Sequence, residues 1–202
     1  MRRWRNDFTF TDSLTEIFNS RWSKEQLEQT VDWEGEEEKE KSKTLALVEF
    51  YLANTPIKPD ERPMAVETML EADLSRHGLP KLIGIVDLVR PGGVIVDFKT
   101  SGQTPNVESI GHQNEIQLTS YGLLYRDSTG DKESGFELHH LVKTKTPKLI
   151  VTPLPPVTDQ QVTRLFKQIE SYLDGVDRED FVPSPGMACL SCQFINECKR
   201  WS

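Results

Sequence analysis

The spacing of apolar residues divides the chain into a helical first part and a second part in which strands and helices alternate. Up to residue 54, apolar residues recur at intervals of three and four, as in Leu14, Ile17 and Phe18, which predicts helices. From residue 64 onward, short runs rich in Val and Ile predict strands. We expect strands within 64–74, a hairpin over 84–101, further strands at 137–142 and 148–152, and helices over 112–126 and 158–173.

Local capping signals suggest where the first helices begin. Residues 11–13, Thr-Asp-Ser, are typical of a helix start, and Ser23 with Gln26 resembles the capping box of a second helix. The charge run EGEEEKEKSK over 34–43 predicts a solvated helix start or a loop. Residues 100–111 are rich in Gly, Pro, Asn and Ser, which predicts a polar loop suited to substrate contact.

The hairpin over residues 84–101 reads GIVDLVRPGGVIVDFKTS and carries three charged side chains with a defined spacing. If its loop is Pro-Gly-Gly, Arg90 faces Val94, and counting outward places Asp87 opposite Asp97. Lys99 follows Asp97 by two residues and therefore lies on the same face of the strand. One face of the hairpin thus carries two carboxylates and an ammonium group.

Two neighbouring carboxylates repel each other unless a cation lies between them, and an oxygen-only pair suits Mg²⁺ or Mn²⁺. The alternative is a solvated sheet face with weak ion pairs, and a slip of one residue would move Asp87 to the other face. Apolar residues at both alternating sets of positions, such as Ile85 and Val86, favour strands that are buried on both faces. Buried carboxylates require a partner, which favours the metal site.

Composition limits the class of protein. With 202 residues, 36% of them hydrophobic, the chain can form one core, and we expect a single domain over 1–202. The net charge of −8 counts against a general nucleic-acid coat protein. No run approaches a membrane span and the N-terminus lacks the apolar segment of a signal peptide, so we expect a cytoplasmic protein with no membrane partner.

The ordered motifs resemble those of a known family. Asp87, then Asp97-Phe98-Lys99, then Gln117 and Tyr121 on a predicted helix, resemble the PD-(D/E)XK nuclease superfamily in its RecB-like branch. The resemblance covers roughly residues 64–201. It implies an α/β fold with a restriction-endonuclease-like core, in which helices flank a central mixed β-sheet.

The resemblance also assigns roles and segments. It implies Asp87 and Asp97 as ligands of Mg²⁺ or Mn²⁺, joined by the carbonyl of Phe98, with Lys99 as the catalytic lysine and with Gln117 and Tyr121 organising the site. The expected layout is a helical segment over 1–55, a nuclease core over 64–175 and a cysteine-rich metal-binding tail over 183–202.

Glu67 resembles the first-strand glutamate of RecB-like nucleases and is either an additional metal ligand or a charge at the sheet edge. Lys143 and Lys145, with Lys148, His139 and His140 nearby, predict a positive strip. This strip either contacts phosphates of a nucleic acid or protects a sheet edge.

The last cysteines form the second strong motif. Cys189, Cys192 and Cys198 have the spacing C-x2-C-x5-C, and thiols that stay reduced tend to be metal ligands. The spacing resembles the tail of iron-sulfur RecB-like nucleases, including CRISPR-associated and helicase-associated ones, which implies three ligands of a [4Fe-4S] cluster. Zn²⁺ bound by three cysteines and a histidine, or three free thiols, are the alternatives.

Relatives of this branch usually carry a metal-binding histidine on an early helix and an early cysteine. In this chain the first histidine is His77 and the first cysteine is Cys189. Either these groups are lost, or they lie in a segment upstream of Met1.

The resemblance therefore implies a metal-dependent DNA nuclease, an exonuclease, acting in DNA repair, recombination, phage or CRISPR-related processing. Its partners would be DNA and a helicase or another DNA-processing protein. The main alternative is a catalytically inactive, nuclease-derived DNA-binding module with a structural metal tail. A structural zinc or iron-sulfur protein with an unrelated partner is the third hypothesis.

Overall fold

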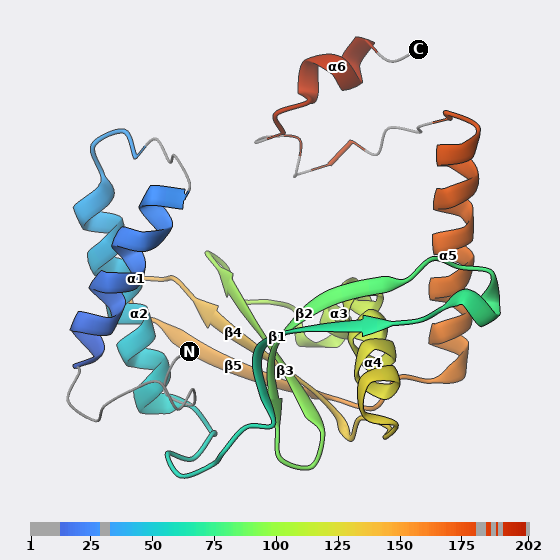
Figure 1. Ribbon diagram of the computed structural model, residues 1–202. Coiled ribbons are helices and arrows are strands. Elements are labelled where there is room, and N and C mark those ends of the chain that lie inside the picture. Colours follow the sequence, from blue (N-terminus) through green and yellow to red (C-terminus); the bar gives the residue numbers. More distant parts are fainter. Residues whose placement is uncertain (1–12, 29–32, 181–184, 187–188, 190–191, 201–202) are drawn as a thin grey trace.

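A computed structural model describes residues 13–28, 33–180, 185–186, 189 and 192–200, and it contains a five-stranded mixed sheet with helices on both faces (Figure 1). The helices are α1 (Leu14–Glu28), α2 (Glu37–Asn54), α3 (Val107–Gln113), α4 (Glu115–Thr129), α5 (Asp159–Asp177) and α6 (Ile195–Arg200), with a 3-10 turn at Ser75–His77. The strands are β1 (Ala65–Ala72), β2 (Leu82–Arg90), β3 (Val94–Ser101), β4 (Gly135–Val142) and β5 (Lys148–Leu154).

The strands follow one another across the sheet in the order β1-β2-β3-β4-β5. Antiparallel pairing joins β1 to β2, β2 to β3, and β4 to β5, whereas β3 and β4 run parallel. The parallel step requires a crossover, which α3 and α4 supply. The sequence predicted this mixed α/β architecture correctly.

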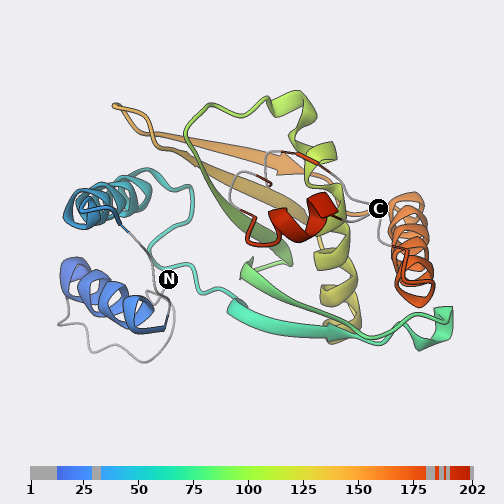
Figure 2. The same ribbon diagram turned by 90° about the horizontal axis from the view of Figure 1, so that it is seen from above.

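The two faces of the sheet are covered by different helices, as Figures 1 and 2 show. On one face, α4 and α5 pack over the main core. Its buried members include Val89, Ile95, Leu118, Leu124 and Leu138. On the other face, Leu47 and Tyr51 of α2 pack with Leu141 and Phe98.

The N-terminal helices differ from the sequence prediction in one respect. The helix α1 runs without a break through Ser23, so the second helix expected there does not exist. Ser13 caps α1 as expected, because its Oγ accepts a hydrogen bond from the backbone N–H of Glu16 and the Glu16 carboxylate accepts one from the N–H of Ser13. Thr11 and Asp12, the other residues of the predicted cap, lie outside the described residues.

The prediction for the segment between β3 and β4 is also partly wrong. Its second half, expected as a loop up to residue 111, forms α3, which Asn106 caps by accepting a hydrogen bond from the N–H of Glu108 at 3.0 Å. The single helix expected over 112–126 is therefore two helices, which meet at Asn114.

The alternation of side chains between the two faces of β2 is interrupted at Asp87. Val86 and Leu88 would share a face in a regular strand, yet Val86 belongs to the core under α4 and Leu88 to a cluster with Ile57 and Val96 on the opposite face. Beyond this interruption Ile85 is 58% exposed. The prediction that both faces of the hairpin are buried is therefore wrong for this end of β2, because no described helix covers its outer face.

Within the described part of the chain, no helix combines the length and apolar character that crossing a membrane requires.

Candidate active site

The hairpin of β2 and β3 has the predicted register near its turn. Arg90 pairs with Val94, Val89 with Ile95 and Leu88 with Val96, and the turn consists of Pro-Gly-Gly as expected. The pairing ends one step before Asp87 and Asp97. Here the Asp87 carboxylate accepts a hydrogen bond from the backbone N–H of Phe98 at 2.9 Å. The two acids therefore flank the point where the strands separate.

The environments of the two acids differ. Burial raises the pKa of Asp87, and the negative charges of Asp97 and Glu67 act in the same direction, while the N–H of Phe98 and the ammonium of Lys99 oppose the rise. Asp97 is only 2% exposed. Its Oδ1 accepts a hydrogen bond from Gln117 Nε2 at 2.9 Å.

The second oxygen of Asp97 is the least satisfied atom of the site. Oδ2 is buried and accepts no hydrogen bond among the described residues. Its compensating neighbour is the Lys99 ammonium at 2.9 Å, which neutralises the charge as an ion pair. A buried carboxylate oxygen in this state can accept a metal ion without giving up a hydrogen bond.

Gln117 joins the lysine, the second acid and the tyrosine. Its Oε1 accepts a hydrogen bond from Lys99 Nζ at 2.7 Å, and its Nε2 donates to Asp97 and to Tyr121 Oη, the latter at 2.9 Å. One amide thus contacts three groups, and its orientation is determined because an ammonium cannot accept and a carboxylate cannot donate.

Helical geometry accounts for the last of these contacts. Gln117 and Tyr121 are separated by one turn of α4 and share a face. Burial raises the pKa of Tyr121, and the charges of Asp97 and Asp87 add to the rise against the hydrogen bond from Gln117. The hydroxyl of Tyr121 is therefore neutral around neutral pH.

Glu67 lies on the exposed edge strand β1 with a positive φ of 44°. Its charge contributes to the raised pKa of Asp87, so it lies within electrostatic range of the site. In the part of the chain that the structure describes, no three His, Cys, Asp or Glu side chains converge closely enough to hold a metal ion. Asp87 and Asp97 are the two carboxylates that flank the end of the β2–β3 pairing.

The predicted positive strip divides into exposed and buried residues. Lys143 and Lys145 are exposed in the turn between β4 and β5. His139 and His140, in contrast, are 0% and 5% exposed. The strip therefore cannot include the histidines, because they alternate into the two faces of a sheet that helices cover.

The three cysteines of the tail are free thiols, with Cys198 exposed and the other two partly exposed. They are not gathered into a group that could hold a metal ion, as far as the described residues extend.

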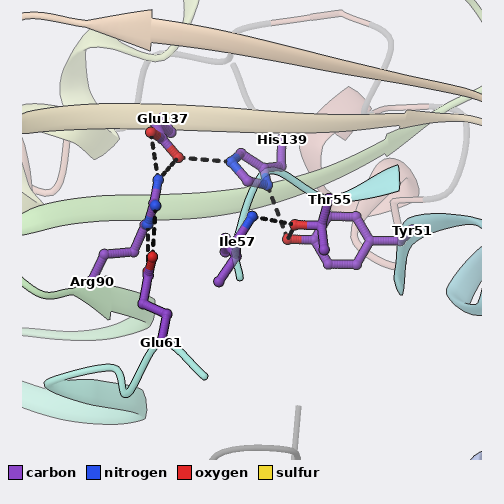
Figure 3. Close-up of polar contacts among 7 residues, drawn as sticks. All are labelled: Tyr51, Thr55, Ile57, Glu61, Arg90, Glu137 and His139. Atoms are coloured by element: carbon purple, nitrogen blue, oxygen red, sulfur yellow. Dashed lines mark hydrogen bonds and ion pairs between the residues drawn. The ribbon is translucent and has the colours of Figure 1, made fainter. Parts of the chain in front are cut away.

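On the face opposite Gln117, a chain of polar contacts links the loop after α2 to β4 (Figure 3). Arg90 forms paired hydrogen bonds with both Glu61 and Glu137, at 2.7–2.9 Å. His139 then contacts Glu137 and Tyr51, each at 3.0 Å. Sequence reasoning missed this network, because its residues are far apart along the chain and form no motif.

Comparison with known proteins identifies the class. The model of the PD-(D/E)XK nuclease superfamily matches residues 6–199, and the chain therefore belongs to this superfamily. Its mixed five-stranded sheet and flanking helices agree with the restriction-endonuclease-like fold that the sequence predicted. None of the curated proteins matches the sequence.

Two solved structures are similar in fold. A protein from Eubacterium rectale, described as "Putative exonuclease", has a TM-score of 0.60 and 16% identity over 98% of this chain and 79% of that chain. The structure of SSO0001 has a TM-score of 0.47 and 14% identity over 95% of this chain and 98% of that chain. At 16% identity, the likeness to the E. rectale protein shows the fold alone.

Proposed function

We propose that the protein is a metal-dependent DNA nuclease that hydrolyses phosphodiester bonds at the cluster of Asp87, Asp97, Lys99 and Gln117. The observation that carries this proposal is the continuous set of contacts from Asp97 through Gln117 to Lys99 and Tyr121. Among these groups, the buried carboxylate suits a divalent cation, and the ammonium can stabilise negative charge that develops on a phosphate.

Asp87 and Asp97 would hold Mg²⁺ or Mn²⁺, with the carbonyl of Phe98 as a further oxygen ligand and Glu67 as a candidate outer ligand. Two observations support this assignment: Asp97 Oδ2 accepts no hydrogen bond among the described residues, and the pKa of Asp87 is raised, which a bound cation would counteract. When bound, such a cation polarises the phosphate and lowers the pKa of a bound water. Mg²⁺ commonly uses only one or two carboxylates and takes its other ligands from water and phosphate.

The other residues act through position and charge. Lys99 carries the positive charge nearest Asp97, which suits it to orient the attacking water and to stabilise the charge that develops on the phosphate. Gln117 holds the lysine relative to Asp97, and Tyr121 holds the amide. Lys143 and Lys145 are available to contact the phosphates of a bound strand.

Assignment as an exonuclease is the finer part of the proposal. It is supported by the RecB-like motifs and by the description of the E. rectale protein, whose structure shares the fold. A role in DNA repair, recombination, phage or CRISPR-related processing, and a helicase partner, remain predictions from the resemblance.

The metal tail is a separate part of the proposal, supported by the C-x2-C-x5-C spacing alone. Anaerobically purified protein would contain iron with a broad visible absorbance if Cys189, Cys192 and Cys198 bind a cluster, and zinc if they bind that ion instead. Protein with neither metal would remove this part of the proposal and leave the nuclease site untouched.

The activity is tested by incubating the protein with end-labelled single-stranded and double-stranded DNA in Mg²⁺, Mn²⁺ or EDTA. We expect metal-dependent release of short labelled products, starting from an end of the strand. A closed circular DNA substrate distinguishes an exonuclease from an endonuclease, because an exonuclease leaves it intact. DNA binding without cleavage would support the inactive DNA-binding module instead.

A further inference from the structure

Two adjacent histidines of β4 are buried, and only one of them has a structural explanation. Both ring nitrogens of His139 are used, Nδ1 with Tyr51 Oη and Nε2 with Glu137, each at 3.0 Å. His140 is 5% exposed, and its Nδ1 is buried without a hydrogen-bond partner in the described part of the chain. An unpaired buried polar atom costs free energy, which calls for another role for this imidazole.

The parallel pairing of β3 and β4 places His140 beside the proposed site. Lys99 is paired with His140, and Asp97 with Leu138 two residues earlier. Leu138 belongs to the core under α4. Because alternate residues share a face, His140 lies on the same side as Leu138, which is the side where Gln117 contacts Asp97 and Lys99.

Electrostatics agrees with this placement. Burial lowers the pKa of His140, the carboxylate of Asp97 and the backbone carbonyl of Leu138 oppose this effect, and the charges of Lys99 and His139 act in the same direction as burial. Both charges of the site therefore act on the ring. A neutral imidazole has one nitrogen that can accept a hydrogen bond.

When a divalent cation is bound at Asp97, the Lys99 ammonium needs another hydrogen-bond acceptor. In the present structure its ammonium is shared between Gln117 Oε1 and Asp97 Oδ2. A divalent cation at Asp97 competes for Oδ2, so the ammonium loses one of its two partners. The lysine has three donors, and the neighbouring position in the ladder carries His140 Nδ1, which has no hydrogen-bond partner among the described residues and accepts when the ring proton is on Nε2.

We propose that His140 is a positioning residue of the active site, whose Nδ1 accepts a hydrogen bond from the Lys99 ammonium when a divalent cation engages Asp97. This inference rests on the proposed function. It explains why the fold retains a buried, unpaired imidazole beside the lysine, and it predicts that His140 affects turnover rather than DNA binding.

The first test needs no catalysis. Nitrogen-15 spectra of the imidazoles are recorded while the free protein is titrated with Mg²⁺. We expect the Nδ1 resonance of His140 to move toward the position of a hydrogen-bonded acceptor, and to stay in place in the Lys99→Met variant. An Nδ1 resonance that does not respond to Mg²⁺ in the wild type overturns the inference.

The second test compares two substitutions that differ in where they place an acceptor. In His140→Asn the amide oxygen lies near the former Nδ1, whereas in His140→Gln it lies near the former Nε2. We expect kcat to fall about 10- to 100-fold in the Gln variant, as for a misplaced catalytic group, and to stay within about 3-fold of wild type in the Asn variant. The KM for DNA should stay within about 3-fold in both variants.

His139→Gln is the matched control on the opposite face. It should lower the melting temperature while leaving kcat near wild type, because His139 supports the network of Figure 3. Equal kcat in wild type and both His140 variants overturns the inference, as does an equal loss in both that tracks their melting temperatures. Absence of cleavage by the wild type overturns the proposed function instead, so the two failures are distinguishable.

Discussion

Asp87 Oδ2 accepts a hydrogen bond from the backbone N–H of Phe98 at 2.9 Å, directly across from where the β2–β3 pairing ends. The position of the first acid is therefore set by the backbone of the strand that carries the second acid. A substitution at Asp87 that removes the negative charge but keeps this acceptor should therefore leave the geometry of the hairpin intact.

Asp87→Asn keeps the acceptor and removes the charge. We expect cleavage to fall by about 100-fold or more, because a ligand of the proposed cation is weakened. The stability of the metal-free protein should not fall at pH 7. The pKa of Asp87 is raised in the folded state, so its contribution to stability is fully present below its ordinary pKa of 3.8 and is lost as the pH rises through the folded value.

Thermal unfolding of metal-free protein between pH 4 and pH 8 measures this effect. The Asn variant should melt at or above the wild-type temperature at pH 7, and the difference should narrow toward low pH. Asp87→Ala is the control, since it leaves the N–H of Phe98 without its acceptor and should cost about 1 kcal/mol. A wild type that melts above the Asn variant at pH 7 would contradict the account.

Gln117 and Tyr121 should contribute unequally to turnover. Gln117→Leu removes three contacts at once and should lower kcat by about 10- to 100-fold, because Lys99 loses its orientation relative to Asp97. Tyr121→Phe removes one contact, and the amide still donates to Asp97, so kcat should fall by less than about 5-fold. Steady-state rates at saturating metal measure both, and a larger loss for Tyr121→Phe would argue against the central role of the amide.

Arg90 should be a major determinant of stability. Arg90→Met leaves the carboxylates of Glu61 and Glu137 without their shared cation, which should cost about 3–5 kcal/mol in urea unfolding at pH 7. Arg164→Met, at an exposed ion pair with Glu115, should leave the free energy of unfolding close to that of the wild type.

The cost of the Arg90 substitution should depend on pH. His139 and Arg90 lower the pKa of Glu137, and Arg90 lowers that of Glu61. The stability that these acids contribute is present above their ordinary pKa of 4.5 and is lost as the pH falls through the folded values. The difference in the free energy of unfolding between wild type and Arg90→Met should therefore become smaller below about pH 4.5. A difference that grows there would contradict the stabilising role of these ion pairs.

The turn of the hairpin can be tested with adjacent glycines. Gly92 and Gly93 both have positive φ, but a Cβ at Gly93 would lie 2.7 Å from Tyr125 Oη, whereas one at Gly92 would meet nothing within 4 Å. Gly93→Ala should therefore be more destabilising than Gly92→Ala by about 1 kcal/mol or more. Equal unfolding free energies for the two variants would show that Tyr125 does not constrain the turn.

Local sequence features were sufficient to predict the hairpin and the pairing of Arg90 with Val94, because a three-residue loop determines which residues face each other. Helical spacing likewise predicted that Gln117 and Tyr121 share a face. The exposure of Ile85 could not be predicted, since it depends on the interrupted alternation of side chains at Asp87 and on which helix covers the strand.

The position of His140 beside Lys99 could not be predicted from the sequence either, because it depends on contacts between distant segments. Its proximity to Lys99 follows from a parallel pairing across a crossover of more than thirty residues, and nothing in the local sequence sets that register. The contact of His139 with Tyr51 spans 88 positions in the chain and is equally hidden.

The most direct test of the central claim is the rate of DNA cleavage by Lys99→Ala beside that of Lys81→Ala. Lys81 lies on the surface in an exposed pair with Glu71, so its loss removes the same charge without touching the site. The account predicts wild-type cleavage in Mn²⁺ for Lys81→Ala and a loss of about 100-fold or more for a folded Lys99→Ala protein. Equal cleavage by the two variants would contradict the assignment of Asp87, Asp97 and Lys99 as the nuclease site.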